Sequence, residues 1–404
     1  MATAATTFEP NSVRSERIAG IDVARALAVL GMITVHTGMG VLAPQYLAPF
    51  TGRASVLFAV LAGVSLALLS GGAEVHRGDK LRSDRRGIVI RGALLFVLGI
   101  ALMLLGTPVV VILATYAVLF WVVTPLLAWS WQRVALLAAV TALVAPVVSF
   151  LVRGRVLPPT DTLGGTVTLD AFMSLDGVLA SLRILLIDGM YPVLTWIPFV
   201  LAGLAVGRWG TGRNGAWPAL LGAGSLLAAA GYGGSYLALH AFGMKAALVQ
   251  GLDDLQPGAG NELFTFFAQH GMMGTVSTHD WRWLFIAFPH AGTPFDILGS
   301  TGVAIIVIAA SIAFARFAPR LLVAPLSALG RMPLTVYAGH IVALWLLTIT
   351  GTLSLSGFQF ALFLAVPLIV AWTWSLFFSQ GPLERLLSRA SRSQIQLRES
   401  TRTA

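Results

Sequence analysis

The sequence predicts an all-α membrane protein that crosses the bilayer about ten times. Hydrophobic residues make up 57% of the 404 residues and charged residues only 11%, and the mean hydropathy is +0.83. A soluble chain of this length carries far more charge. About ten apolar runs are long enough, or nearly so, to cross a hydrocarbon core of roughly 30 Å. Helices are expected because each backbone polar group in lipid must find its partner within its own segment.

The predicted spans are joined by short loops except at two places. They cover residues 19–41, 54–71, 87–105, 109–128, 134–152, 191–208, 217–241, 295–315, 326–349 and 358–378. The long connections are 153–190 and 242–294. The second is too long for a simple connector, and we expect it to fold over the outer vestibule.

Arginine is concentrated in alternate short loops, and cytoplasmic loops of membrane proteins carry such an excess. With about ten spans these loops all lie on one side, together with both chain ends. The sequence therefore predicts cytoplasmic termini and a location in the cell membrane. The formal net charge of +9 follows from this arrangement, so we expect the lipid bilayer as a partner and no nucleic acid.

The first predicted span carries polar residues at both ends of one face. Arg25 and His36 are eleven positions apart, so in an α-helix they lie within roughly 20° of each other. Asp22 falls on the same side. This pattern indicates a helix that faces a cavity and not lipid.

His36 and Asp22 are the predicted catalytic residues. Imidazole is the side chain most easily poised to accept a proton near neutral pH. The structural alternative is a histidine that is hydrogen-bonded at the outer interface. Asp22 and Arg25 also have a structural explanation, because an acid and a base three residues apart stabilise a helix end.

Arginines near the third span could hold the phosphates of a donor that enters from the cytosol, since guanidinium groups match phosphate oxygens. The predicted donor-binding residues are Arg25, Arg85, Arg86 and Arg91. Arg82 in the same run is explained as well by the charge bias of the loop. Arg91 lies within apolar helix and should need an internal partner.

The predicted acceptor-binding residues lie toward the outer face. Arg53 begins the second span on the side opposite the arginine-rich loops, His290 precedes a turn, and His340 lies well inside the ninth span. Tyr191 and Trp196 complete the set. For His290 and His340 a purely structural role fits the sequence equally well.

Several other kinds of chemistry have no support in the sequence. The chain has no cysteine, which excludes a thiolate nucleophile and a cysteine metal site. No two histidines have the i,i+4 spacing of a helical zinc motif, so we expect no metal. Hydrolase elbows, P-loops and dinucleotide-binding glycine motifs are missing as well.

The stretches RIAGIDVARALAVLGMITVH and GRASVLFAVLAGVSLALLSGG resemble the heparan-α-glucosaminide N-acetyltransferase catalytic domain as it occurs in bacteria. The Arg25-x10-His36 spacing is similar to the R-x10-H signature of acyltransferase type 3, a related family. The second half is similar to domain of unknown function 418, which is often fused to that catalytic domain. The stretches that carry this similarity are YPVLTWIPFVLAGLAVGR, PHAGTPFDILGSTG, LGRMPLTVYAGHIV and FSQGPLERLL.

The resemblance implies transfer of an acyl group across the membrane. Acyl-CoA, most simply acetyl-CoA, would bind from the cytosol, and an extracytoplasmic saccharide or similar acceptor would receive the group. His36 matches the catalytic histidine of the family and Arg25 its motif arginine. Many members of the fused family have asparagine in place of the histidine, and Ala26 replaces the usual glycine here.

The same resemblance implies four regions and leaves the mechanism open. The regions are a cytoplasmic tail at 1–18, an acyltransferase-like region at 19–210, a second transmembrane region at 211–384 and a basic cytoplasmic tail at 385–404. Direct transfer, with His36 as general base, is favoured over an acyl-histidine only because the first span holds no second histidine. A homodimer is plausible.

Two functions of other classes compete with the enzyme. A ten-helix bundle with interior charges could be a transporter or flippase of the cell envelope, although the halves show no paired broken helices. Such a protein would ignore CoA. A membrane scaffold is the third alternative, and it would tolerate loss of His36.

Overall fold

The computed structural model describes residues 18–157, 170–213, 215–352 and 355–400, and these residues form helices and turns without any strand. The predicted all-α class is therefore confirmed. Nine helices coincide with predicted spans: α1 (Ala19–Gly38), α3 (Arg53–Leu69), α4 (Gly78–Met103), α5 (Leu113–Val123), α6 (Trp131–Arg155), α8 (Val193–Trp209), α13 (Pro294–Phe317), α15 (Pro333–Ile349) and α16 (Gly357–Phe377).

The seventh predicted span is a continuous series of short helical pieces. It consists of α9 (Ala216–Ala228), η4 (Ala229–Gly233), α10 (Gly234–Tyr236) and η5 (Leu237–Ala241), of which η4 and η5 are π-helical turns. The remaining elements lie between spans or at their ends: α2 (Pro44–Leu47), η1 (Thr124–Ala128), η2 (Asp170–Met173), α7 (Leu175–Arg183), η3 (Ile184–Asp188), α11 (Met244–Leu255), α12 (Gly260–His270), η6 (Trp281–Phe285), α14 (Arg320–Gly330) and α17 (Pro382–Ser400).

Within the described residues, length and composition support fewer spans than the sequence predicts. Five helices are long and apolar enough to cross a membrane, or up to seven if each bent pair counts as one span. The second and fourth predicted spans fall short because Arg53–Leu69 and Leu113–Ala128 are apolar but shorter than 18 residues. The chain is thus a multi-pass membrane protein, while the prediction of about ten spans exceeds what this criterion supports.

Several predicted boundaries differ from the structure. The third span begins at Gly78 and not at residue 87, because the basic residues between them are good helix formers. The connection 153–190 contains α7 and η3, which meet α8 at a bend of 49°. The ninth span is divided into α14 and α15 with a 71° bend. Pro333 occupies the first turn of α15, where its fixed φ favours a new helix start.

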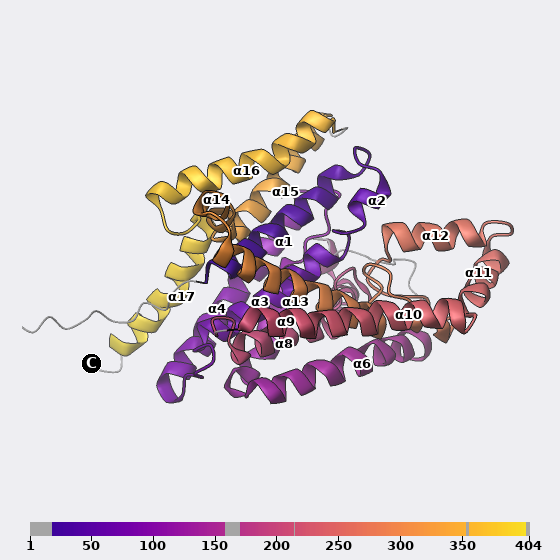
Figure 1. The fold of residues 1–404 in the computed structure, drawn as a ribbon, viewed down its shortest axis with the longest axis horizontal. Helices are drawn as coiled ribbons and strands as arrows, with labels where there is room; N and C mark the ends of the chain where they lie inside the picture. The colour runs from indigo at the N-terminus through magenta and orange to yellow at the C-terminus, as the bar shows by residue number, and fades with distance from the viewer. Residues whose placement is uncertain (1–17, 158–169, 214, 353–354, 401–404) are drawn as a thin grey trace, which may run out of the picture.

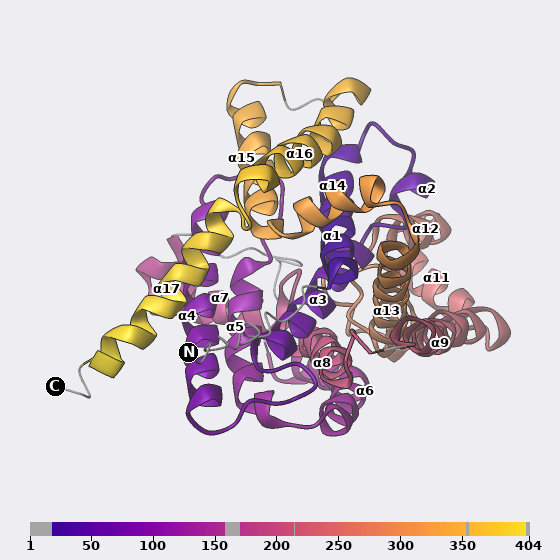
Figure 2. The same cartoon turned by 60° about the vertical axis from the view of Figure 1, so that its left-hand side comes forward.

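Helix α1 lies at the centre of the bundle (Figure 1). It contacts α3 and α13 on one side and α14, α15 and α16 on the other, so both halves of the chain surround it. Helix α17 lies beside α4 (Figure 2). Helix α16 buries only Ala371, and its exposed surface is the apolar kind that lipid covers.

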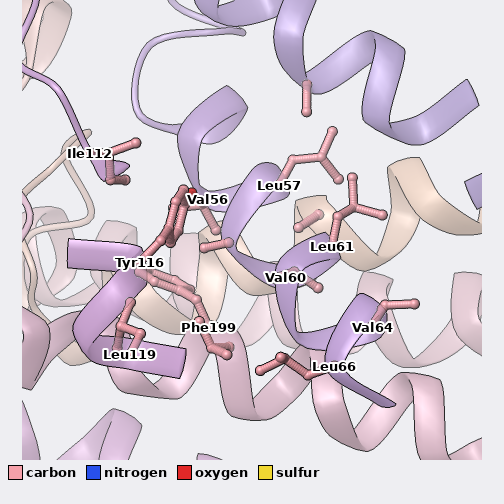
Figure 3. Packing of buried hydrophobic residues seen from close by; sticks show 14 of the residues in the cluster. Val56, Leu57, Val60, Leu61, Val64, Leu66, Ile112, Tyr116, Leu119 and Phe199 are labelled. Carbon is pink, nitrogen blue, oxygen red and sulfur yellow. The ribbon is translucent and has the colours of Figure 1, made fainter. Parts of the chain in front are cut away.

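The core between α3, α5 and α8 is tightly packed. Val56 and Val60 of α3 lie on the side of this helix that faces Tyr116 of α5 and Phe199 of α8, and Leu61 and Val64 lie on its other side (Figure 3). Small residues let α3 and α8 approach each other, as is usual between membrane helices. This contact fixes the position of α3, which ends beside the charged cavity described below.

Glycine is required where α3 crosses α8. A Cβ added at Gly203 would lie 1.8 Å from the Val60 carbonyl oxygen, whereas one added at Gly222 of α9 would meet nothing within 4 Å. We expect Gly203→Ala to lower the free energy of unfolding by roughly 1–3 kcal/mol, because the helices must separate. The matched Gly222→Ala should be neutral or slightly stabilising. Thermal unfolding in detergent measures both, and equal melting temperatures would contradict this packing.

The segment between η5 and α13 forms a small unit of its own. Buried residues of α11, α12 and η6, among them Leu252, Phe264 and Trp283, pack into a second hydrophobic core. Backbone hydrogen bonds from Met272 and Gly274 reach the carbonyls of Pro289 and His290. The long connection therefore supports the turn that carries His290, one of the predicted acceptor-binding residues.

Candidate functional site

The two ends of α1 take part in two separate groups of polar residues. Asp22 and Arg25 line a large cavity together with residues of α3, α4, α15 and α17. His36, near the other end of α1, contacts His340. Arg25 and His36 are eleven residues apart, which corresponds to about 16 Å along the helix axis.

The charged cavity has a volume of about 1040 Å³. It lies where the end of α3, the first half of α4, the α14–α15 junction and the start of α17 come together. Its basic lining residues are Arg25, Lys80, Arg91 and Arg331, its acidic ones are Asp22 and Glu384, and His76 is also present. Leu95, Leu113, Tyr116 and Phe120 line its apolar part. A basic cavity with an apolar part suits a phosphate-bearing ligand with a long, less polar arm.

Asp22 holds Arg25 within the cavity wall. An Arg25 guanidinium nitrogen lies 2.7 Å from the Asp22 carboxylate, and another donates to the Ser65 hydroxyl at 3.0 Å. The Asp22 side chain is only 2% exposed, against 18% for Arg25. The carboxylate therefore orients the guanidinium, and the structure places Asp22 with Arg25 and not with the predicted catalytic partner His36.

The structure separates the predicted donor-binding arginines. Arg25 and Arg91 line the cavity, whereas Arg85 and Arg86 do not. Arg85 donates to the Pro125 carbonyl at 2.9 Å, and Arg86 is exposed. Lys80 lines the cavity instead, and it lies eleven residues before Arg91 on the same face of α4.

Arg208 of α8 shapes the rim of the charged cavity and was not singled out in the sequence. Its side chain is 3% exposed. It donates to the carbonyls of Ser70 and Gly72 at 3.1 and 2.7 Å and to the Ser70 hydroxyl at 2.7 Å. These bonds hold the turn after α3, whose Gly72 lines the cavity.

The second group, here called the histidine cluster, consists of His36, His290 and His340. His36 Nδ1 lies 3.0 Å from His340 Nε2, and the two ring planes are nearly parallel, inclined by 9°, with centroids 5.2 Å apart. His290 is near enough to His36 for their charges to interact. Within the part of the chain that the structure describes, no three metal-binding side chains form a group suited to a metal ion.

Aromatic and charged residues surround the histidine cluster. The Tyr191 ring packs edge-on against both His290 and Trp196, with centroids 5.7 and 5.0 Å apart. Arg53 donates to the Tyr232 hydroxyl at 3.2 Å, and its charge acts on His290. The five predicted acceptor-binding residues therefore lie around His36 or next to one another. They are Arg53, Tyr191, Trp196, His290 and His340.

Tyr232 and Asp296 extend this network. Asp296 follows His290 at the start of the eighth predicted span but is not among the predicted site residues, and Tyr232 was not singled out in the sequence. The Tyr232 hydroxyl is 3.3 Å from that of Ser300, which donates to the Asp296 carboxylate at 2.8 Å. Asp296 also accepts from the Gly292 amide at 3.1 Å. The chain of bonds from Arg53 to Asp296 ties the start of α3 to the turn after His290.

His290 is held neutral by its surroundings. Burial, followed by the charges of Arg53 and His36, lowers the pKa of its imidazole to about 4. The unfolded chain binds this proton near pH 6.5, so folding stability is lost as the pH falls from about 6.5 towards 4. We expect the melting temperature of His290→Asn to fall less steeply over this range than that of the wild type.

Asparagine is chosen for this variant because His290 has a φ of 57°, and asparagine tolerates the left-handed conformation. The control is His270→Asn, because His270 is exposed at the end of α12. It should keep the wild-type slope. An unchanged slope for His290→Asn would contradict the neutral buried histidine.

Tyr337 connects the charged cavity to the histidine cluster. The Ile112 amide donates to its hydroxyl at 3.5 Å, and the next residue, Leu113, lines the cavity. On its other side, the Tyr337 ring packs edge-on against His340 with centroids 5.2 Å apart. A continuous series of contacts thus runs from the cavity through Tyr337 and His340 to His36.

These features define a multi-pass α-helical membrane protein with a basic cavity at one end of its central helix and a histidine cluster toward the other. The sequence profile of the family described as "Heparan-alpha-glucosaminide N-acetyltransferase, catalytic" matches residues 17–231, which is more than half of the chain. The chain belongs to this family and is a transmembrane acyltransferase. A search of curated proteins found no match. The resemblance of the second half to domain of unknown function 418 stays a prediction.

Proposed function

We propose that the protein transfers an acetyl group from cytosolic acetyl-CoA to an extracytoplasmic acceptor, such as the amine or hydroxyl of a cell-envelope sugar. Acetyltransferases of this family use acetyl-CoA as the donor. The observation that carries the proposal is the continuous series of side-chain contacts from the charged cavity through Tyr337 and His340 to His36. It gives a phosphate-binding end and a proton acceptor on one central helix.

Arg25, Lys80, Arg91 and Arg331 would hold the phosphates of the donor, with Asp22 orienting Arg25. The pantetheine arm would lie along the apolar part of the cavity toward Leu113 and Tyr116. The thioester would then reach the histidine cluster beside Tyr337. This placement uses binding energy far from the reacting atoms to position the thioester.

At the histidine cluster His36 would act as general base. As the acceptor nitrogen or oxygen attacks the thioester carbonyl carbon, His36 takes its proton, the C–S bond breaks, and CoA leaves as the thiolate. His36 then gives this proton to the thiolate, which leaves as CoA, and the imidazole is neutral again. Tyr191, which is half-buried and packs beside His290 and Trp196, would contact the apolar face of a sugar ring.

A binding measurement on the purified protein tests the donor. Acetyl-CoA at about a hundredfold excess over its Kd should raise the stability by roughly 2.7 kcal/mol. Acetylpantetheine, which lacks the nucleotide and its phosphates, should stabilise far less. Absence of stabilisation by any CoA ester would refute the donor site and favour a transporter.

The transporter has one structural observation in its favour. The structure contains two bent helix pairs, α7–η3 with α8 and α14 with α15, and broken helices are common in transporters. The sequence alone predicts no such pair. Turnover distinguishes the two functions, because a transporter would release no CoA from acetyl-CoA in the presence of glucosamine.

A further inference from the structure

The contact between His36 and His340 constrains where the protons of both rings can be. His36 Nδ1 and His340 Nε2 are 3.0 Å apart, a distance that fits a hydrogen bond between ring nitrogens. Such a bond requires a proton on one of these atoms and a lone pair on the other. The two neutral rings therefore have two possible combinations of tautomers.

The surroundings of His340 favour one combination. Its ring is 3% exposed, and the backbone carbonyls of Val336 and Tyr337 in the preceding turn of α15 interact with it. His340 Nδ1 is buried without a well-formed hydrogen bond of its own, and carbonyl groups beside it favour a proton at that atom. His340 Nε2 then carries the lone pair and accepts from His36 Nδ1–H.

We propose that His340 is a positioning residue that keeps His36 in the form with Nδ1 protonated and Nε2 free to accept a proton. This role rests on the proposed function. His340 lies outside residues 17–231, so the family match does not assign it. In the serine protease triad a carboxylate orients the catalytic histidine. Here the neutral imidazole of His340 would orient His36 in the same way.

The role of His340 during the reaction is limited to a hydrogen bond. His36 Nε2 receives the proton of the acceptor while the new bond to the acyl carbon forms and the C–S bond breaks. The positive charge on His36 is then shared through Nδ1–H with His340 Nε2, which is 3.0 Å away. No bond forms between His340 and the acyl group.

The α15 helix that carries His340 is itself fixed from the opposite end of the bundle. The Glu384 carboxylate of α17 accepts from the Leu334 amide at 2.7 Å and from the Thr335 hydroxyl at 2.6 Å. A carboxylate at a helix N-terminus is stabilising because it pairs with amide groups that lack partners. His340 thus has a rigid support that can keep its ring in a fixed position against the ring of His36.

Two variants of His340 test this role by turnover of acetyl-CoA with glucosamine. His340→Leu removes the acceptor of the hydrogen bond, and we expect kcat to fall about 10- to 100-fold with little change in KM for acetyl-CoA. His340→Gln keeps an oxygen acceptor and should recover most of the loss. Wild-type kcat in His340→Leu, or equal losses in both variants, would overturn the role.

Nitrogen NMR of protein labelled with ¹⁵N-histidine gives a second readout that does not depend on turnover. The signals of His36 are identified by their disappearance in His36→Gln. In the wild type, Nδ1 of His36 should be protonated and Nε2 unprotonated, and His340→Leu should change this distribution. The same distribution in both would overturn the role, whereas a wild type that fails to turn over acetyl-CoA would count against the proposed function alone.

Discussion

Replacing His36 with alanine is expected to lower the rate of acetyl transfer by about 10²- to 10⁴-fold, the range typical for loss of a general base. The reason is that the proton of the attacking acceptor would lose the imidazole that is proposed to take it. Donor binding should persist, because His36 does not line the cavity. The release of CoA from acetyl-CoA with glucosamine measures the rate, and thermal stabilisation by CoA measures binding.

A histidine far from the cluster provides the matched control. His240 is exposed at the end of η5, where it contacts the Tyr236 carbonyl and ring in its own turn. His240→Ala should therefore keep wild-type turnover. A His36→Ala protein that transfers acetyl groups at the wild-type rate would eliminate the proposed base.

The second large effect is expected from Arg25, whose loss should weaken CoA binding. Arg25→Gln removes a guanidinium from the cavity wall together with its 2.7 Å ion pair to Asp22. We expect the Kd for CoA to rise by at least about tenfold, which corresponds to 1.4 kcal/mol of binding free energy. Titration of the purified protein followed by thermal shift gives this Kd.

Folding and binding effects at Arg25 can be separated. The double variant Arg25→Gln/Asp22→Asn removes both charges, so it should regain stability without regaining CoA affinity. Arg82→Gln is the surface control, because Arg82 is 63% exposed and does not line the cavity. If Arg25→Gln bound CoA as tightly as Arg82→Gln, the charged cavity would not be the donor site.

The central helix was the most predictable part of this molecule. Helical periodicity relates Arg25 to His36 within one segment, and the structure confirms that α1 is continuous from Ala19 to Gly38. Periodicity does not show which other helix meets a given residue. The pairing of His36 with His340 spans 304 residues, so it depends on how α15 packs against α1.

The donor-binding arginines show how one misplaced boundary changes a prediction. The predicted span starts at residue 87, so the basic residues before it could not be assigned to one side of a helix. Once α4 begins at Gly78, Lys80 and Arg91 fall within roughly 20° of each other, while Arg85 and Arg86 are turned more than 100° away from Arg91. The early start explains why Lys80 lines the cavity and those two arginines do not.

The most direct test of transmembrane acetyl transfer uses sealed proteoliposomes that contain glucosamine. Acetyl-CoA labelled in the acetyl group is added outside only, where it reaches molecules whose charged cavity opens outward. We expect labelled N-acetylglucosamine to form inside the vesicles with the wild type and not with His36→Ala. Product that forms only when both substrates share one compartment would contradict transfer through the bundle.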